Sequence, residues 1–576
     1  MNFKLRLVAL LLVVLMCLTS CDALLGFINP TPSTEATTEA TKATTLKPTT
    51  PTTSKPAEDK WVRGDHSLSS AELKAMYTLT REEVDATLAL LDDMLEASKT
   101  ATAEDTSEFD ALYEQFEESF YHMAEQRTIA MIIYYFDMSN AEATTRQEDT
   151  TNMFMEVQDK YNIICRQMYL ESPIKDILFE GWTEEEIQSL MDYDPVVMEI
   201  RKAINALEDE YNKLENDPDF ANKSAEIYAQ IVVKNNELAA YYGYDNYYTF
   251  ASENTYGREY DAQQLEVFKE YVVQYILPGF SNVYARYKKV NSLSSSDKSF
   301  VNKFMNGKFD GMSTNYLVNY LDSLGDTTMG QSMRHMFENK NCLFSGKPNS
   351  HPTAFCTYLY ESEQPFCLFG SSGQSSTTMV HEIGHYYAYL VNSDLDSYDL
   401  AETHSQSNEF LFLEYCQPQM SAEAFDVIYS YQLVNACYII VMASIIDEFE
   451  QRVYALDSDV VATYTSADFD AIMEDVCKPY GGAVYVKSEL ADPFNYWRQV
   501  TITSPVYYIS YAVSSVAALE INSLVNTDKE AAYQAYITLV EDVTNEDGFI
   551  GALEIAGLSS PFEEETYKAI AEELKP

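Results

Sequence analysis

From Trp61 to Pro576 the chain repeats apolar residues at the spacing of an α-helix, and few residues interrupt the pattern. Residues 71–97 (AELKAMYTLTREEVDATLALLDDMLEA) and 225–243 (AEIYAQIVVKNNELAAYYG) carry apolar side chains at i, i+3, i+4 and i+7. Only 19 Gly and 18 Pro occur in 576 residues, so the residues that usually form turns and end strands are scarce. The sequence therefore predicts a mainly α-helical protein.

One short region departs from this pattern. Residues 342–370 (CLFSGKPNSHPTAFCTYLYESEQPFCLFG) combine β-branched and aromatic runs with Gly and Pro, which predicts two hairpin strands near 354–360 and 365–370. The chain has nine Cys and no CxxC pair. We interpret the seven Cys that follow Cys21 as buried small hydrophobic residues, with one bridge among Cys342, Cys356 and Cys367 as the alternative.

The first 21 residues (MNFKLRLVALLLVVLMCLTSC) are typical of a secretory signal. Two basic residues precede an apolar run from 7 to 18, which is too short to span a bilayer as a stable helix. The run ends in LTSC at 18–21, which resembles the lipobox of bacterial lipoproteins. The resemblance implies cleavage before Cys21 and attachment of a diacylglyceryl group to its thiol. An ordinary signal peptide that carries a Cys is the alternative.

A linker follows the predicted leader. Thr and Pro dominate residues 30–57 (PTPSTEATTEATKATTLKPTTPTTSKPA), and such a segment cannot form a hydrophobic core. We expect it to hold a globular body at a bacterial cell surface, with the membrane contacted only through the lipid on Cys21. The later stretch Leu433–Ile446 comes closest to a membrane span, but it is too short, and we interpret it as a buried core helix.

The charge of the chain excludes one class of partner. With 90 acidic and 38 basic residues, the formal net charge is −52. Binding to nucleic acid depends on Lys and Arg that neutralise phosphates, so we predict no nucleic-acid partner. The acidic residues are scattered over helix faces, and we interpret them as solvated surface, with repulsion of anionic substrates as the alternative.

Three of the seven His fall within residues 381–404, directly after the strand region. The segment TTMVHEIGHYYAYL (377–390) contains His381, Glu382 and His385. Residues four apart lie on one face of a helix, so both imidazoles can reach one metal ion, and Glu382 can hold a metal-bound water beside that face. Imidazole is a good zinc ligand, and a catalytic zinc site takes three protein ligands plus water.

The third ligand must come from another segment. Residues 400–415 (LAETHSQSNEFLFLEY) are predicted to form a second helix, on which Glu402 and Glu409 are seven apart and share a face. His404 lies on the other side of the turn and is a poor partner for the same ion. Spacing alone leaves Glu402 and Glu409 as equal candidates.

Two segments, 381–385 (HEIGH) and 402–406 (ETHSQ), together resemble motifs of the oligopeptidase F branch of the thimet oligopeptidase family of zinc metallopeptidases. That family carries His-Glu-x-Gly-His and then a Glu within a Glu-x-x-Ser-Gln-like motif; this chain has HEIGH at 381–385 and ETHSQ at 402–406. The resemblance implies that His381, His385 and Glu402 bind one Zn²⁺ and that Glu382 is the general base. It makes Glu409 a carboxylate that orients a ligand histidine.

Other segments match family features in the same order, so the resemblance covers roughly residue 110 to the C-terminus. They are SGKPNS (345–350), PFCLFG (365–370), ACYIIVMASIIDEFEQRVY (436–454), YGG (480–482), YWRQV (496–500) and AGLSSPF (556–562). The implied architecture is a mainly α, two-lobed helical shell around a deep cleft, with a small β-sheet next to the active-site helix. We accordingly expect four regions: a signal peptide (1–20), the lipidated Cys and linker (21–60), an N-terminal helical region (61–200) and a zinc metallopeptidase domain (201–576).

The resemblance also directs attention to tyrosines near the C-terminal end. Family members place several tyrosines on a Gly- or Ala-rich segment, where their hydroxyls donate hydrogen bonds to the oxyanion. The corresponding segment here is SPVYYISYAVSSVA (504–517). We expect Tyr508 and Tyr511 to be catalytic and Tyr507 to bind substrate. Ser504 and Ile509 stand where relatives often have further tyrosines.

These observations together predict a zinc metallopeptidase that hydrolyses short, unfolded oligopeptides at the cell surface. We expect it to be a monomer, although no sequence feature reports on the oligomeric state. One alternative is a zinc carboxypeptidase or dipeptidase on a related helical fold. Another is a catalytically retired lipoprotein that only binds peptides. A peptide-binding protein would have no need to keep Glu382.

Overall fold

The computed structural model describes residues 65–182, 187, 190, 195–214, 217–306, 312–393, 395 and 397–576. The predicted signal peptide, Cys21 and the Thr/Pro-rich linker lie outside the described residues. The boundary predicted near residue 200 stays a prediction.

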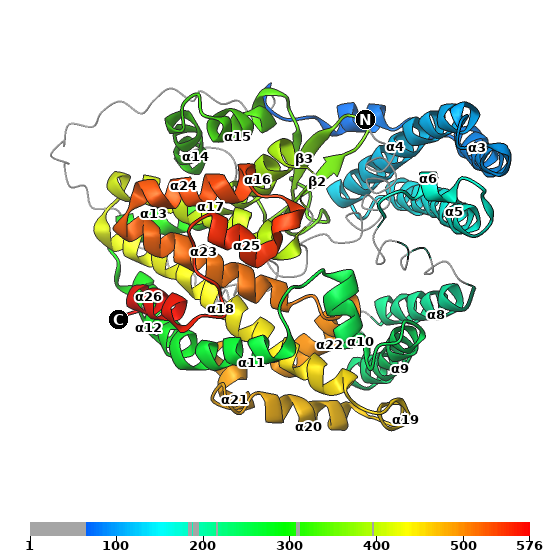
Figure 1. Cartoon of the computed structure of the whole chain (residues 1–576). Helices are drawn as coiled ribbons and strands as arrows, with labels where there is room; N and C mark the ends of the chain where they lie inside the picture. The colour runs from blue at the N-terminus through cyan, green and yellow to red at the C-terminus, as the bar shows by residue number, and fades with distance from the viewer. Residues whose placement is uncertain are drawn as a thin grey trace.

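The mainly helical fold predicted from the periodicity is confirmed (Figure 1). Before the sheet, the helices are α2 (Ser70–Met76), α3 (Arg81–Thr100), α4 (Ser107–Phe136), α5 (Ala141–Glu171), α6 (Lys175–Leu178), α8 (Pro195–Asn212), α9 (Phe220–Tyr241), α10 (Tyr247–Phe250), α11 (Ala262–Tyr271), α12 (Leu277–Tyr287), α13 (Ser295–Asn306), α14 (Met312–Ser323) and α15 (Thr328–Glu338). Two short π-helical turns, η3 (Ala251–Thr255) and η4 (Val272–Ile276), continue α10 and α11.

After the sheet, the chain is again helical to its end. These helices are α16 (Ser376–Val391), α17 (Tyr398–Cys416), α18 (Ala422–Tyr454), α19 (Ser458–Val461), α20 (Ser466–Val476), α21 (Ala483–Glu489), α22 (Pro493–Thr503), α23 (Ile509–Thr527), α24 (Lys529–Glu541), α25 (Gly548–Ile555) and α26 (Glu564–Glu573).

The strands are β1 (Cys342–Phe344), β2 (Ala354–Leu359) and β3 (Gln364–Phe369), in the order β1-β3-β2. The predicted hairpin is confirmed as the antiparallel pair β2–β3, and β1 adds a parallel strand that the pattern did not predict. Cys367 lies opposite both Cys342 and Cys356, yet all seven Cys of the described chain are free thiols. All of these except the half-buried Cys356 are buried, so their interpretation as small hydrophobic residues holds.

The sheet lies between α4 and α16. One face of the sheet packs on isoleucines of α4, and the other joins the large core that includes α16; alternate residues of a strand point to opposite faces. The free edge of β1 is covered by the start of the described chain, because the Leu68 N–H donates to the Cys342 carbonyl (2.9 Å). The sheet thus connects the N-terminal helices to the helix that carries the His-Glu-x-x-His motif.

The longest helix, α18, is a core helix, as predicted for Leu433–Ile446. By length and composition α18 is the one helix of the described residues that could cross a membrane, but 78% of its most apolar stretch is buried inside the protein. It packs against α12 and α23, and α23 packs in turn along α17. Burial of these apolar faces is the main stabilising term for the helices around the candidate site.

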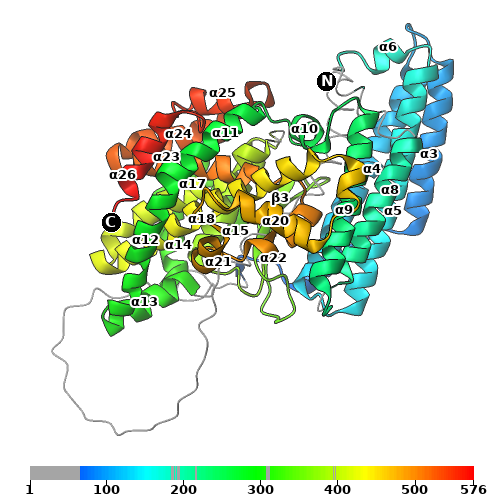
Figure 2. The ribbon, with the colours of Figure 1, turned by 90° about the horizontal axis from the view of Figure 1, so that it is seen from below.

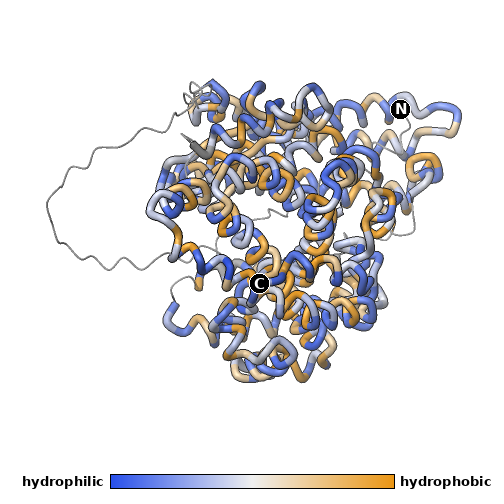
Figure 3. Tube along the Cα trace, turned by 90° about the vertical axis from the view of Figure 1, so that its left-hand side faces the viewer, coloured by the Kyte–Doolittle hydropathy of each residue, from blue (hydrophilic) through white to orange (hydrophobic). Residues whose placement is uncertain are grey.

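The helices fall into two groups in space. Figures 1 and 2 show α3, α4, α5, α8 and α9 along one side of the molecule, with most of the later helices on the other. Most buried apolar residues of 79–190 form a core of their own, and most of those of 214–574 form the largest core. Figure 3 shows hydrophilic and hydrophobic residues alternating along most helices, which is the pattern of helices that bury one face.

Candidate active site

Helix α16 places two histidines on one face. The helix begins after Ser375, whose hydroxyl accepts a hydrogen bond from the Thr378 N–H (3.2 Å) and so caps the first turn. His381 and His385 follow in the second and third turns, with their ring centres 5.0 Å apart. This is the separation expected for residues four apart on a helix.

Helix α17 brings a carboxylate to these two rings. One nitrogen or oxygen of each of His381, His385 and Glu402 lies within 4.8 Å of the others. Glu402 Oε2 is 3.5 Å from His381 Nε2, and Glu402 Oε1 is 4.0 Å from His385 Nε2. All three side chains are buried. The structure therefore unites the three residues that the motif pair singles out.

A glycine allows the two helices to approach this closely. A Cβ on Gly384 would lie 2.8 Å from the Ser405 Cα and 2.9 Å from the His404 carbonyl oxygen. Both are backbone atoms, so neither can move aside as the end of a side chain can. The Gly of the HEIGH motif is therefore a packing residue that lets α16 lie against α17.

Glu409 takes an outer position. The His381 Nδ1–H donates to Glu409 Oε1 (2.8 Å), and Gln432 of α18 donates to Glu409 Oε2 (2.7 Å). This leaves His381 Nε2 directed at Glu402. Spacing left the two glutamates equal, and the structure separates them: Glu402 joins the histidine pair, whereas Glu409 holds one ring in place. Carboxylate–histidine pairs of this kind orient metal ligands.

The buried group has the electrostatics of a cation site. Burial lowers the pKa of His385 to about 3, so this imidazole is neutral and has a lone pair at neutral pH. Burial opposes the charged form of His381 too, but the hydrogen bond to Glu409 and the charge of Glu402 outweigh it and raise the His381 pKa to about 9. Within the described chain, His385 Nε2 is buried and has no hydrogen-bond partner. Two imidazole nitrogens and one carboxylate fit a divalent metal ion such as zinc.

Glu382 is buried beside the three donors. It follows His381 on α16, is 2% exposed, and its charge contributes to the raised pKa of His381. The main-chain carbonyl of Glu382 accepts a hydrogen bond from the Cys367 thiol of β3 (3.9 Å between sulfur and oxygen). The sheet thus supports the helix at the position of the predicted base.

The three predicted tyrosines form one buried cluster at the start of α23. The ring centres of Tyr507 and Tyr511 are 5.1 Å apart, and those of Tyr508 and Tyr511 are 5.7 Å apart. The Tyr508 ring meets Tyr496 edge to face, while Tyr507 meets Tyr398 at the first residue of α17. The cluster therefore touches the helix that carries Glu402, one turn before it.

Hydrogen bonds align α23 with α17. The Ser514 hydroxyl donates to the Asp399 carbonyl (2.6 Å), and the Ser515 hydroxyl donates to Gln406 Oε1 (2.8 Å). His404 lies apart from the histidine pair, as its spacing predicts, because its Nε2–H donates to the Leu539 carbonyl of α24 (3.1 Å). Sequence reasoning missed Gln432, which has no local signal; only the fold brings it to Glu409.

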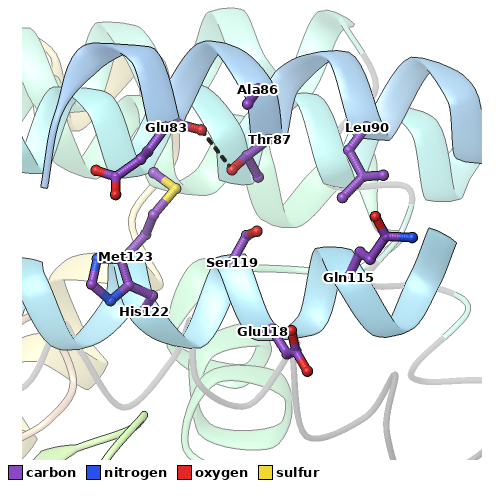
Figure 4. A pocket seen from close by; sticks show the side chains of 9 residues that line it. All are labelled: Glu83, Ala86, Thr87, Leu90, Gln115, Glu118, Ser119, His122 and Met123. Carbon is purple, nitrogen blue, oxygen red and sulfur yellow. Dashed lines mark hydrogen bonds between the residues drawn. The ribbon is translucent and has the colours of Figure 1, made fainter. Parts of the chain in front are cut away.

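A different histidine lines a pocket among the N-terminal helices (Figure 4). This pocket of about 480 Å³ lies between α3 and α4. Its polar residues include Glu83, Glu118, Ser119 and His122. Glu83 is engaged by the Thr80 N–H and hydroxyl at the start of α3, and His122 Nδ1 bonds Glu361 of the β2–β3 turn (2.8 Å). These residues do not form a convergent group of donors.

Comparison with solved structures places the fold. No protein-family model matches the chain, and no curated protein matches it. An oligoendopeptidase F from Bacillus anthracis str. Ames is similar over 86% of this chain and 95% of its own (TM-score 0.63, 18% identity). PZ peptidase A, solved with an inhibitor, is similar over 86% and 97% (TM-score 0.63, 19% identity). Oligoendopeptidase-F from Enterococcus faecium is similar over 86% and 98% (TM-score 0.54, 13% identity). The chain shares the helical fold of these structures over nearly their whole length.

Proposed function

We propose that this chain is a zinc metallopeptidase that hydrolyses short, unfolded oligopeptides. The observation that carries the proposal is the buried convergence of His381, His385 and Glu402, with Glu382 next to them on α16. The fold shared with proteins named as oligoendopeptidases supports the same reaction class.

Each residue of the group has a role in this reaction. His381, His385 and Glu402 would hold one Zn²⁺, and Glu409 and Gln432 keep the His381 ring in its orientation. When bound, the ion supplies Lewis-acid polarisation of the scissile carbonyl and lowers the pKa of the attacking water. Glu382 accepts the proton that the water loses on attack and delivers it to the leaving amine. Hydroxyls of the Tyr508 and Tyr511 pair donate to the oxyanion, and Tyr507 contacts substrate.

The test is peptide cleavage by the purified protein, with and without a zinc chelator, and by the Glu382→Gln variant. We expect chelator-sensitive cleavage of quenched-fluorescent oligopeptides and no cleavage of folded proteins. Loss of the base should lower kcat about 10³-fold while one zinc per chain stays bound, because Glu382 is not among the ligands. The exposed Glu530→Gln serves as the matched control and should behave as wild type.

The same assay separates the alternatives. Peptides blocked at both termini remain substrates of an endo-acting enzyme and are spared by a carboxypeptidase or dipeptidase. Undiminished turnover by Glu382→Gln would refute the assigned base. Tight zinc and peptide binding without any cleavage would identify a peptide-binding protein.

We propose further that the protein is anchored to the bacterial cell surface by a lipid on Cys21. The support is the LTSC sequence at 18–21 and the Thr/Pro-rich segment after it. Metabolic labelling with a radioactive fatty acid should label the wild-type protein and not Cys21→Ser. Equal labelling of both would refute the anchor.

A further inference from the structure

The turn that leads into α23 contains a strained residue. Val506 has φ +64° and is buried. This left-handed conformation suits glycine, and a β-branched residue adopts it only with strain. Among the described non-glycine residues, Lys340 and Glu363 also have positive φ, but neither is β-branched. Val506 directly precedes Tyr507, the first residue of the tyrosine cluster.

Two buried ionisable side chains hold this residue by its backbone. The Val506 N–H donates to Glu450 Oε1 of α18 (2.8 Å). The Val506 carbonyl accepts a hydrogen bond from Arg258 Nη2 (2.7 Å), and the same nitrogen donates to the Ser510 hydroxyl oxygen (3.0 Å). Glu450 is 1% exposed and Arg258 is 7% exposed. The backbone N–H and the backbone carbonyl of Val506 are therefore both bound by residues distant in the sequence.

The same arrangement reaches the tyrosines. Arg258 stacks on the Tyr256 ring (4.5 Å from its Cζ to the ring centre), and the Tyr256 hydroxyl donates to the Pro505 carbonyl (2.7 Å). The Tyr256 ring also packs on Tyr507 (5.7 Å between ring centres). Because Tyr507 packs on Tyr511, a change in the Val506 turn would move both hydroxyls.

A turn that served only to join two helices would not need these groups. Glycine adopts φ near +60° without strain, and burying a carboxylate and a guanidinium costs desolvation energy. Backbone strain that the surroundings enforce is concentrated where a side chain must be aimed.

We propose that Glu450 and Arg258 are positioning residues for peptide hydrolysis: they hold Val506 in its strained conformation and thereby aim the hydroxyls of Tyr507, Tyr508 and Tyr511. The inference rests on the proposed function. The residues act through the tyrosines and touch neither the metal ligands nor Glu382 in this role. Misplacing an oxyanion donor by about 1 Å costs on the order of 100-fold in rate.

The first test compares Glu450→Ala with Glu450→Gln. Glutamine keeps an acceptor oxygen for the Val506 N–H, whereas alanine removes it, so the two variants differ in this hydrogen bond. We expect Glu450→Ala to lower kcat about 100-fold with KM within about twofold, and Glu450→Gln to stay within about threefold of wild type. Unchanged kcat in a folded Glu450→Ala, or equal losses in both variants, would overturn the proposal.

A double-mutant cycle tests whether Glu450 acts through a tyrosine. If it does, Tyr511→Phe added to Glu450→Ala should cost less than threefold beyond the Glu450→Ala loss, because the hydroxyl is already misplaced. Fully multiplicative losses would show that Glu450 acts independently. We call the hydrogen bonds from Glu450 and Arg258 to the Val506 backbone the clamp. Should Glu450→Ala fail to fold, the double variant Glu450→Ala/Val506→Gly provides the test, since glycine adopts φ +64° without the clamp. We expect that variant to fold with kcat within about tenfold of Val506→Gly, and a larger loss would refute the clamp.

A structural readout separates this inference from the proposed function. Amide hydrogen exchange of residues 504–511 should be faster in Glu450→Ala than in Glu450→Gln, while residues 376–391 stay protected in both. A wild-type protein that cleaves no peptide would refute the proposed function, yet the exchange experiment would still test the clamp. Equal protection of 504–511 in both variants would refute the clamp even if the protein is an active peptidase.

Discussion

The pocket between α3 and α4 and the group formed by α16 and α17 contain the same kinds of side chain, a histidine with nearby carboxylates. In the pocket (Figure 4), His122 is only partly buried and bonds Glu361, while Glu83 caps its own helix. Nε2 of His122 and Nε2 of His385 are both buried without a hydrogen-bond partner in the described chain. Only at His385 do a second histidine and a carboxylate join it, with their ligand atoms all within 4.8 Å of one another in the described residues.

The difference shows what residue type alone does not reveal. An exposed carboxylate is solvated by water and gains little from a cation, whereas a buried carboxylate between two imidazoles has lost its water and must be compensated. Burial, convergence and an outer carboxylate such as Glu409 are the conditions that favour metal binding by a histidine.

Removal of a proposed ligand should have the largest effect. We expect His385→Ala to weaken zinc binding more than 100-fold and to abolish peptide cleavage, since loss of a direct ligand exceeds the 10–100-fold cost of losing an outer partner. His122→Ala is the matched control, and we expect unchanged zinc content and kcat. Zinc content measured by elemental analysis after dialysis decides the comparison; equal loss in both variants would contradict it.

The close approach of α16 and α17 should be nearly as sensitive. Gly384→Ala places a methyl group against backbone atoms of α17, and we expect it to lower the free energy of unfolding by about 3 kcal/mol. Gly346→Ala is the control, because its added methyl group meets nothing within 4 Å. Urea unfolding followed by circular dichroism measures both. A Gly384→Ala protein as stable as wild type would show that the helices can separate.

The outer carboxylate should have an intermediate effect. We expect Glu409→Gln to weaken zinc binding 10–100-fold, because the amide orients the His381 ring less strongly than the carboxylate does. Glu118→Gln, in the pocket between α3 and α4, should leave zinc binding unchanged. Competition with a zinc-binding dye gives both affinities, and identical values would show that Glu409 serves stability alone.

Replacement of His404, a buried histidine outside the proposed ligand set, should have the smallest effect, and that effect is on the pH dependence of stability. His404 has its pKa lowered to about 4 by burial, so the folded protein keeps it neutral while the unfolded chain protonates it near pH 6.5. Stability from this residue is therefore complete above pH 6.5 and falls as the pH drops toward 4. We expect wild type to lose about 1 kcal/mol more than His404→Gln between pH 7.0 and 5.5, in urea unfolding with the metal chelated. Equal losses of unfolding free energy in wild type and His404→Gln would show that other residues cause the acid sensitivity.

Periodicity and motif spacing predicted the helical fold, the β2–β3 hairpin and the pairing of His381 with His385, because these depend on local sequence. The choice between Glu402 and Glu409 needed either the family resemblance or the fold, since both lie on one face of α17. The clamp on Val506 left no trace in the sequence: Glu450 is 56 residues away and Arg258 is 248 residues away. Strand β1 was missed for the same reason, because three residues in a parallel pair carry no hairpin signal.

The contact between Leu68 and the edge of β1 has a consequence for the order of folding. It joins residues 274 positions apart, so it cannot form during synthesis until the chain has grown past Cys342. The α3–α4–α5 helices, whose contacts are local, can pack much earlier. Closing this edge of the sheet is therefore a late step, which joins the N-terminal end of the described chain to a strand 274 residues later.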